Sequence, residues 1–280
     1  MAAMPATLRV SDPGAAWAVP DPRELALRIR LRAVRMVAPA GSGYLGQALS
    51  SAEQVAAVFA SARPGVDRIV CSPGHYIIGP FAAAAELGLI DLSGYGQNDS
   101  AFEAIGTERS PVVDYTCGSL GQGLSAALGF ALADRFRGRD ARVFTMVSDG
   151  ELEEGQVWEA ALFAAHHRLD RLVVLLDANN SQVDGPVDSI TTLEPIAAKW
   201  AAFGWDVWDL DGHDVSALSV ALAAAPMRAG QPSVLVCRTS TRHGLDCLPP
   251  DADGHFIKLT PELAFAAERE LTGKLEALRA

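Results

Sequence analysis

The sequence has few cysteines, no excess of basic residues and no long uninterrupted apolar run. The four cysteines (positions 71, 117, 237 and 247) lack the close spacing of metal ligands, which is typical of reduced thiols in a cytosolic chain. A formal net charge of −11 disfavours a nucleic-acid partner, for which a basic stripe is expected. The first residues lack the features of a secretory signal, and no segment reaches the length that spans a bilayer. We therefore expect a cytoplasmic protein with no nucleic-acid or membrane partner.

The 280 residues are 49% hydrophobic and 20% charged, which is enough for one large domain with a buried core. Short strand-like apolar runs alternate along the chain with alanine-rich runs of helical periodicity. This alternation predicts an α/β fold, a doubly wound, mostly parallel sheet with helices on both faces. The strand-like runs are residues 68–71, 142–147, 171–177, 205–210 and 233–238, and the helical runs are 52–62, 80–88, 122–136, 156–167, 193–202 and 214–225.

The two ends of the chain differ from this body. We predict an extended N-terminal lead over residues 1–21 and a single domain over residues 22–280, which ends in a charged helical tail from about residue 260. A helix is also predicted over residues 24–37. Its arginines, at positions 28, 30, 32 and 35, are interpreted as solvated charges on its outer face.

The most informative motif is Ser148-Asp149-Gly150-Glu151-Leu152-Glu153-Glu154-Gly155, followed thirty residues after Asp149 by Asn179. Asp149 follows one strand-like run and Asn179 follows the next, so both are predicted at the carboxyl edge of the sheet. Open α/β sheets bind ligands at this edge, with anions near helix N-termini. Asp149, the Asn179 side-chain oxygen and a nearby carbonyl are hard oxygen ligands suited to Mg²⁺ or Ca²⁺. Spacing alone also allows a simpler interpretation, in which these residues only form turns and helix starts.

The segment 148–185 resembles the thiamine diphosphate motif, which begins Gly-Asp-Gly and ends in Asn about thirty residues later. Residues 149–160 look specifically like transketolases, above all the short N-terminal subunit of the two-subunit kind. Ser148 replaces the first glycine of the motif. Further matches follow in family order: Gly46-Gln47-Ala48-Leu49-Ser50, Ser72-Pro73-Gly74-His75, Gly118-Ser119-Leu120-Gly121-Gln122-Gly123 and Asp211-Gly212-His213-Asp214.

The resemblance implies thiamine diphosphate with Mg²⁺ as cofactors, Ca²⁺ being possible. Asp149, Asn179 and the Ser181 carbonyl would hold the metal. The other predicted cofactor-binding residues are Gly118, Ser119, Leu120, Gly150, Glu151 and Glu154. Glycines in such loops let the backbone approach a ligand closely.

A second glycine pattern, over residues 41–46, fits the fingerprint of dinucleotide-binding folds, with Asp67 about twenty residues beyond it. That fingerprint should follow a strand, whereas the segment before it has helical periodicity. Asp67 also precedes a strand-like run instead of ending one. We therefore do not expect a nicotinamide cofactor.

Three residues are predicted to be catalytic. His75 matches the family's Ser-Lys-Gly-His loop, with Pro73 in place of lysine, and a histidine can shuttle protons near neutral pH. His255 stands for the late family histidine, in a different local context. Tyr44 occupies the position of the early family histidine. For each histidine, a structural side chain with satisfied hydrogen bonds is the alternative.

A further family histidine is replaced by Thr107, so two imidazoles have left the predicted donor pocket. In transketolases these groups hydrogen-bond the ketol hydroxyls, and loss of such a buried partner costs roughly 1–3 kcal/mol. The departures at Tyr44 and Thr107 therefore predict a specialised ketol or acyl transferase.

In this family, the glutamate that activates the cofactor lies in a pyrimidine-binding domain, for which 280 residues leave no room. The resemblance therefore implies a second subunit carrying the pyrimidine-binding and C-terminal transketolase domains, with two copies of each chain in a heterotetramer. Alone, the chain should be inactive. Two alternatives stay open: a subunit of a 2-oxo acid decarboxylase or dehydrogenase, and a non-catalytic scaffold related to a ketolase.

Overall fold

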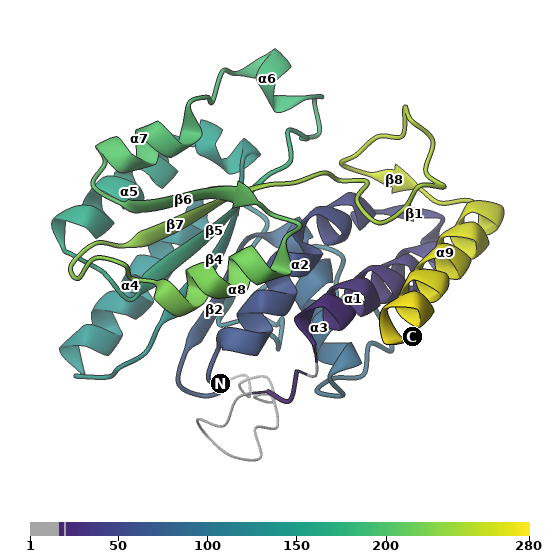
Figure 1. Ribbon diagram of the computed structural model, residues 1–280, viewed down its shortest axis with the longest axis horizontal. Helices are drawn as coiled ribbons and strands as arrows, with labels where there is room; N and C mark the ends of the chain where they lie inside the picture. Colours follow the sequence, from purple (N-terminus) through teal and green to yellow (C-terminus); the bar gives the residue numbers. More distant parts are fainter. Residues whose placement is uncertain (1–16, 20) are drawn as a thin grey trace.

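The computed structural model describes residues 17–19 and 21–280, whose centre is a parallel six-stranded sheet (Figure 1). The strands lie in the order β3-β2-β4-β5-β7-β6. Their bounds are β2 (Arg68–Pro73), β3 (Tyr115–Cys117), β4 (Val143–Ser148), β5 (Leu172–Ala178), β6 (Asp206–Asp211) and β7 (Ser233–Arg238). The predicted α/β fold and its parallel sheet are confirmed, although the sequence pattern missed the three-residue β3. The predicted N-terminal lead lies almost entirely outside the described residues.

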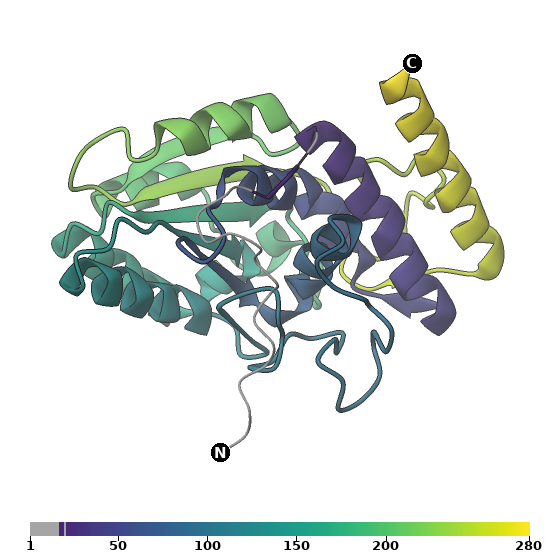
Figure 2. The same cartoon turned by 90° about the horizontal axis from the view of Figure 1, so that it is seen from below.

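Helices cover both faces of the sheet. In Figure 2 the strands lie between α8, drawn in green, and the teal helices α4 and α5. The α-helices are α1 (Pro22–Val37), α2 (Leu45–Ser61), α3 (Ile78–Glu86), α4 (Gln122–Phe136), α5 (Gly155–His166), α6 (Val187–Ile190), α7 (Ile196–Ala202), α8 (Val215–Ala224) and α9 (Pro261–Arg279). Helices α4, α5 and α7 contribute to one core, and α1, α2, α3, α8 and α9 contribute to the other. The doubly wound arrangement is thus present.

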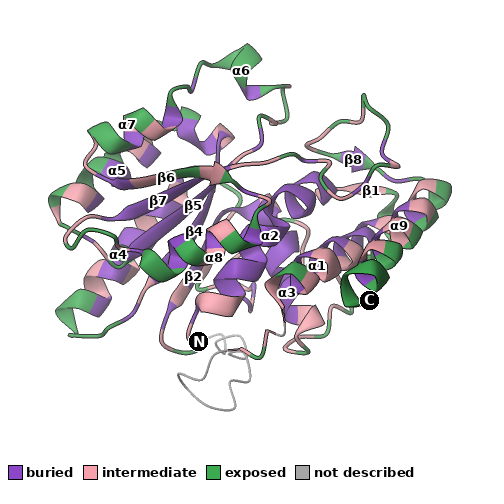
Figure 3. Cartoon of the chain, viewed as in Figure 1, coloured by how far each residue is buried: buried purple, intermediate pink, exposed green. Residues whose placement is uncertain are grey.

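The strands are buried on both sides, which explains why they appear in the sequence as continuous apolar runs. Along β5, Val173 and Leu175 belong to one core, whereas Val174 and Leu176 belong to the other. Alternation between two apolar faces is what a parallel sheet covered by helices requires. Figure 3 shows this contrast, with purple strands and a largely green, exposed α6. Within the described residues, each helix is either too short or too polar to cross a membrane.

Helix α1 forms a second layer, packed against α2, α3 and α9. The prediction that all four of its arginines are solvated is wrong for Arg30, which is 1% exposed and pairs with buried Glu53 at 2.6 Å. Helical periodicity did not predict the burial of Arg30, because α1 packs against helices on more than one side and some of its charged side chains are therefore buried. The other three arginines form partly exposed ion pairs with Glu24, Glu86 and Glu268.

Two helices begin three or more residues from their predicted starts. Helix α2 begins at Leu45, seven residues before the predicted start, because the glycine-containing segment 46–50 is itself helical. Helix α7 begins at Ile196, after Pro195, instead of at 193. Residues that precede a proline are kept out of the helical region of backbone space, which accounts for the later start.

A small antiparallel sheet was not predicted. It pairs β1 (Ser42–Gly43) with β8 (Ile257–Lys258). Strands of two residues have no detectable period, so no sequence pattern revealed them. Their pairing brings the segment before α2 next to the segment before α9.

Candidate functional site

Asp149 and Asn179 meet at the carboxyl edge of the sheet, as their positions after neighbouring strands predicted. Ser148 of β4 pairs with Asp177 of β5, so the residues that follow lie side by side. The Asp149 carboxylate accepts hydrogen bonds from the backbone N–H groups of Gly150 (2.9 Å) and Asn180 (2.6 Å). The Asn179 side-chain oxygen accepts one from Ser181 N–H at 2.9 Å. The side chains of Asp149 and Asn179 therefore hold the backbone around the predicted metal site through these hydrogen bonds.

The electrostatics of this edge favour a bound cation. Asp149 is 3% exposed, and burial, followed by the nearby Asp177 charge, raises its pKa to about 7. Within the described chain no arginine, lysine or histidine forms an ion pair with Asp149. Carboxylate and amide oxygens in this arrangement fit a hard divalent ion, which would offset the charge that burial disfavours.

Asp177, at the end of β5, organises this edge and was missed by the sequence reasoning. Its buried carboxylate accepts hydrogen bonds from the side chains of Ser50 (2.6 Å), Gln54 (2.7 Å), Tyr76 (2.8 Å), Thr239 (2.6 Å) and Asn179 (2.7 Å). Because the amide nitrogen of Asn179 donates to Asp177, the side-chain oxygen of Asn179 faces away from Asp177. The available signal was a carboxylate that ends an otherwise apolar buried strand.

The glycine loop lies beside this edge, between β3 and α4. Gly118 and Ser119 are exposed and Leu120 is half-buried, so the loop backbone is accessible. Gly121 has a φ of 80°, a left-handed conformation that glycine adopts without strain. Gly123 lies against β2, where an added Cβ would come within 2.4 Å of Ser72 Cα.

The side chain of Glu151 packs beneath the glycine loop and hydrogen-bonds its backbone. Its carboxylate is fully buried and accepts hydrogen bonds from Ser72 Oγ (2.6 Å), Gly121 N–H (2.7 Å) and Ser148 N–H (3.2 Å). Burial raises its pKa to about 7. These contacts make Glu151 a positioning residue for the loop, and direct contact with a cofactor stays a prediction.

The other predicted cofactor residues are more open. An added Cβ at Gly150 would first meet the Gln182 side chain at 3.6 Å, so space remains on that side. Glu154 is exposed and lies over the Gly121 backbone, where an added Cβ would come within 2.9 Å of Glu154 Cβ. The roles of both residues stay predictions.

The three predicted catalytic residues come together in one cluster. The ring centroid of Tyr44 lies 5.2 Å from that of His75 and 5.8 Å from that of His255. The two imidazole centroids are 5.0 Å apart. Tyr44 follows β1, His75 follows β2, and His255 precedes β8, so the short β1–β8 pairing helps to assemble the cluster.

Both histidines of the cluster are neutral near physiological pH. Burial, and then the neighbouring His255, lowers the pKa of His75 to about 3. Burial also lowers the pKa of His255. Partial burial therefore keeps the His75 imidazole neutral in the chain as described, and its catalytic role stays a prediction. Each ring acts instead as a neutral hydrogen-bond donor and acceptor.

Thr107 lies in a segment that contacts the His75 loop, since Gly106 N–H donates to Gly74 O at 2.8 Å. Its hydroxyl accepts from Arg109 N–H at 3.3 Å, and its own N–H donates to Ser110 Oγ at 3.1 Å. A residue that departs from the family pattern thus closes a local turn beside the histidine cluster.

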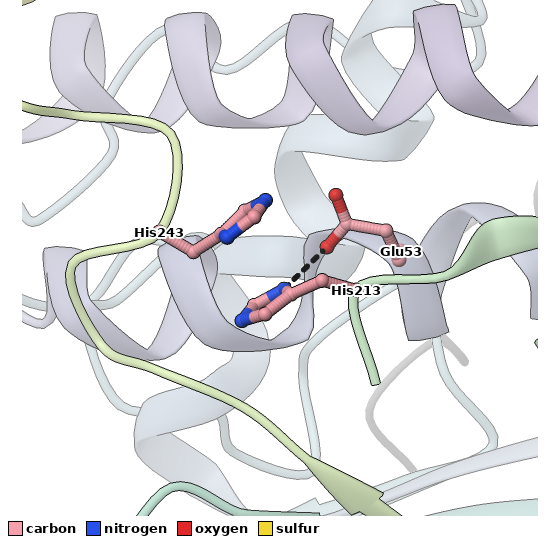
Figure 4. A group of neighbouring side chains, drawn as sticks. All are labelled: Glu53, His213 and His243. Carbon is pink, nitrogen blue, oxygen red and sulfur yellow. Dashed lines mark hydrogen bonds and ion pairs between the residues drawn. The ribbon is translucent and has the colours of Figure 1, made fainter. Parts of the chain in front are cut away.

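A second histidine cluster lies outside this site, on another side of α2 (Figure 4). Glu53, His213 and His243 place their ligand atoms within 4.8 Å of one another. The two imidazole rings are stacked, 3.6 Å apart and 9° from parallel, so their in-plane lone pairs cannot converge on one ion. Glu53 is also held by Arg30, and His213 bridges Glu53 (3.1 Å) and Ser240 N–H (2.9 Å). The cluster ties the loop after β7 to α2 and is not a metal centre.

Comparisons with known proteins agree with this geometry. Residues 22–260 match the family described as transketolase, thiamine diphosphate binding domain. The chain is 38% identical over 253 residues to a putative uncharacterized transketolase family protein of Sinorhizobium fredii, covering 85% of this chain and 91% of the relative. It is 36% identical over 262 residues to a 6-deoxy-6-sulfo-D-fructose transketolase subunit of a Clostridium species, covering 87% and 93%.

The fold is likewise that of a solved transketolase from Campylobacter jejuni. The TM-score is 0.80 at 25% identity, and the similarity covers 90% of this chain and 42% of the solved one. The chain thus spans less than half of that solved protein.

Proposed function

Because this chain belongs to the transketolase family, we propose that it is the N-terminal, diphosphate-binding subunit of a two-subunit transketolase-like enzyme. The enzyme transfers a two-carbon ketol or related acyl unit from a ketose-type donor to an aldehyde or other acceptor, in specialised metabolism. The observation that carries this proposal is the pair of oxygen ligands, Asp149 and Asn179, at adjacent strand ends beside an open glycine loop. The transketolase names of the relatives favour it over a 2-oxo acid decarboxylase or dehydrogenase.

Thiamine diphosphate, when bound, supplies the carbon nucleophile for C–C bond cleavage and formation. Asp149, the Asn179 side-chain oxygen and the Ser181 carbonyl hold Mg²⁺, or Ca²⁺, against the diphosphate. The exposed loop residues Gly118 and Ser119, with Leu120 and Gly150, offer backbone to the cofactor. The buried Asp149 carboxylate, which has no cationic partner among the described residues, supports this assignment.

The substrate end of the site is the Tyr44–His75–His255 cluster. Two neutral imidazoles and a phenol hydroxyl suit hydrogen bonding to the carbonyl and hydroxyl oxygens of a donor sugar. His75 and His255 hold and move protons at those oxygens through their neutral ring nitrogens. Tyr44 stands in this cluster at the position where the resemblance places a family histidine.

The partner is a second chain with the pyrimidine-binding and C-terminal transketolase domains, in a heterotetramer with two copies of each. A relative that bears the word subunit in its name is matched over 93% of its length, which supports this division between chains. Glu154, exposed beside the glycine loop, reaches toward that partner or supports the cofactor. The free cysteines support a cytoplasmic location.

A ketose-donor screen on the complex tests the proposal. The chain is co-expressed with the product of the neighbouring gene, and ketol transfer to aldehydes is followed with and without thiamine diphosphate and Mg²⁺. Cofactor-dependent transfer by the complex, lost in Asp149→Ala, is the expected result. A scaffold function predicts no transfer in either protein and no effect of the substitution on assembly.

A further inference from the structure

The side chain of Gln47, in the first turn of helix α2, reaches the ring of His255. It is 1% exposed, and its Nε2 lies 3.2 Å from Nδ1 of that imidazole. Its Oε1 is buried and has no hydrogen-bond partner. A buried amide with one atom unpaired is unusual. Among the described residues, the contact with His255 is the one hydrogen bond of the Gln47 side chain.

The backbone around His255 is fixed independently. Gly46 and Gly254 are in close contact, since an added Cβ at Gly46 would lie 1.9 Å from Gly254 O. His255 N–H donates to Asp253 Oδ1 at 2.8 Å and closes a turn. Backbone packing thus sets the position of His255. Gln47 can affect only the orientation of the His255 ring and the site of its proton.

The contact decides which ring nitrogen of His255 carries the proton. A neutral imidazole has one N–H donor and one acceptor nitrogen, and the partner of one nitrogen sets the role of the other. In the amide orientation of the structure, the Gln47 N–H group donates to Nδ1, which leaves the proton on Nε2. The reverse orientation of the amide would place its oxygen at Nδ1 and move the proton there.

This choice has a chemical consequence, because His255 borders Tyr44 and His75. In the described part of the chain, Nε2 of His255 has no hydrogen-bond partner, so it is available to a ligand. With the proton on Nε2, the ring offers a donor to an oxygen atom. With the proton on Nδ1, it would offer a base instead.

We propose that Gln47 is a positioning residue, which holds His255 as the Nε2–H tautomer and so makes this imidazole a hydrogen-bond donor to a substrate oxygen. The substrate oxygen as hydrogen-bond acceptor rests on the proposed function, whereas the tautomer of His255 does not depend on it.

The tautomer is measured directly by two-bond ¹H–¹⁵N NMR correlation spectra of the full ¹⁵N-labelled chain, with the His255 signals identified by their loss in His255→Gln. The wild-type ring should show a protonated Nε2 and an unprotonated Nδ1. Gln47→Glu, which presents only acceptors, should move the proton to Nδ1. Gln47→Met, of similar length and fully apolar, should give a mixture of the two tautomers.

Ser51→Ala is the matched control. Ser51 lies one turn further along α2 and donates to Gln47 O at 2.6 Å without contacting His255, so its loss should leave the tautomer unchanged. A wild-type ring protonated on Nδ1, or a ring in Gln47→Met that keeps the wild-type pattern, overturns the proposal. The wild-type measurement decides even if a variant does not fold.

Turnover of the complex supplies the second readout. Gln47→Met should lower kcat by about tenfold at unchanged cofactor affinity, less than the roughly 10²-fold or larger loss from removing an acid–base group itself. An unchanged kcat overturns the proposal. A complex that transfers no ketol unit from any donor contradicts the proposed function instead, and leaves the NMR result standing.

Discussion

The two halves of the candidate site are built differently. At the diphosphate edge, Asp149, Asn179 and Asp177 are buried, and every carboxylate oxygen has hydrogen-bond donors from the backbone or from buried side chains. In the substrate cluster, Tyr44, His75 and His255 are half-buried and meet mainly through ring contacts.

This difference matches the way the residues relate to the family. By the resemblance, the diphosphate edge keeps the acidic and amide ligands expected of the motif, whereas the cluster carries Tyr44 at the position expected for a histidine. A dense network tolerates little change, because removing one member leaves buried partners unpaired. A loosely bonded aromatic pocket can exchange side chains at lower cost.

Removing the Asp149 carboxylate should have the largest effect. Asp149→Asn is expected to weaken metal and cofactor binding by the complex by more than the roughly 10–100-fold that loss of an outer-shell partner costs. Calorimetric titration of thiamine diphosphate in the presence of Mg²⁺ measures this. Asp188→Asn, an exposed carboxylate on α6, is the control and should bind normally. Equal affinities in the two variants would contradict the assignment of Asp149.

Asp177→Ala should act on stability as well as on binding. It leaves buried donors on Ser50, Gln54 and Tyr76 without an acceptor, and we expect the free energy of unfolding to fall by about 3 kcal/mol. Urea denaturation of the isolated chain measures the change. Asp209→Ala, at a half-exposed ion pair of β6, is the comparison and should cost about 1 kcal/mol or less. A smaller loss of unfolding free energy in Asp177→Ala than in Asp209→Ala would contradict the assignment of Asp177 to a tightly bonded network.

Tyr44 substitutions should change substrate choice and leave the diphosphate edge intact. Tyr44→His restores the family imidazole, and we expect kcat/KM ratios between donor sugars to shift by roughly tenfold, the worth of one hydrogen bond to a substrate hydroxyl. Tyr44→Phe separates the hydroxyl from the ring. Cofactor affinity should match that of wild type in both variants. A loss of cofactor binding with unaltered donor ratios would show that the two regions are not independent.

The pH dependence of stability should have opposite signs in the two regions, with slopes of at most about 1.4 kcal/mol per pH unit for one proton. Burial raises the pKa of Glu151 to about 7, so the folded chain binds more protons than the unfolded one above pH 4.5, and stability falls as the pH rises toward 7. Burial lowers the pKa of His75 to about 3, so stability falls as the pH drops below 6.5.

Urea denaturation of the metal-free chain between pH 4 and 8 separates these contributions. The two pH ranges overlap between 4.5 and 6.5, and Asp149 acts in the same direction as Glu151, so each contribution is measured as the difference between variant and wild type. Glu151→Gln should lessen the fall in stability as the pH rises from 4.5 to 7, whereas His75→Gln should lessen the fall as the pH drops below 6.5. A difference of the opposite sign in either variant would contradict the assigned cause of that slope.

Most of the fold followed from patterns that the sequence displays locally. The helix predicted over residues 122–136 coincides with α4, and five of the six strands of the main sheet were anticipated, because two-sided burial gives continuous apolar runs. Asp149 and Asn179 were predicted to lie together because parallel strands end at a common edge.

The remainder depended on tertiary contacts. The network around Asp177 joins α2, the segment after β7 and the segment after β2, which no local period connects. Burial of Arg30 follows from the packing of α1 between other helices, and the pairing of β1 with β8 involves two residues on each side. The neutral state of His75 follows from its depth in the folded chain, which a motif does not encode.

The most direct test of the account is a crystal structure of the two-subunit complex grown with thiamine diphosphate and Mn²⁺, whose anomalous signal locates the metal. We predict the metal between the Asp149 carboxylate and the Asn179 side-chain oxygen, with the diphosphate alongside Gly150 and the reactive end of the cofactor facing His75 and His255. Metal and cofactor bound elsewhere on the complex, with the carboxyl edge of this sheet empty, would contradict it.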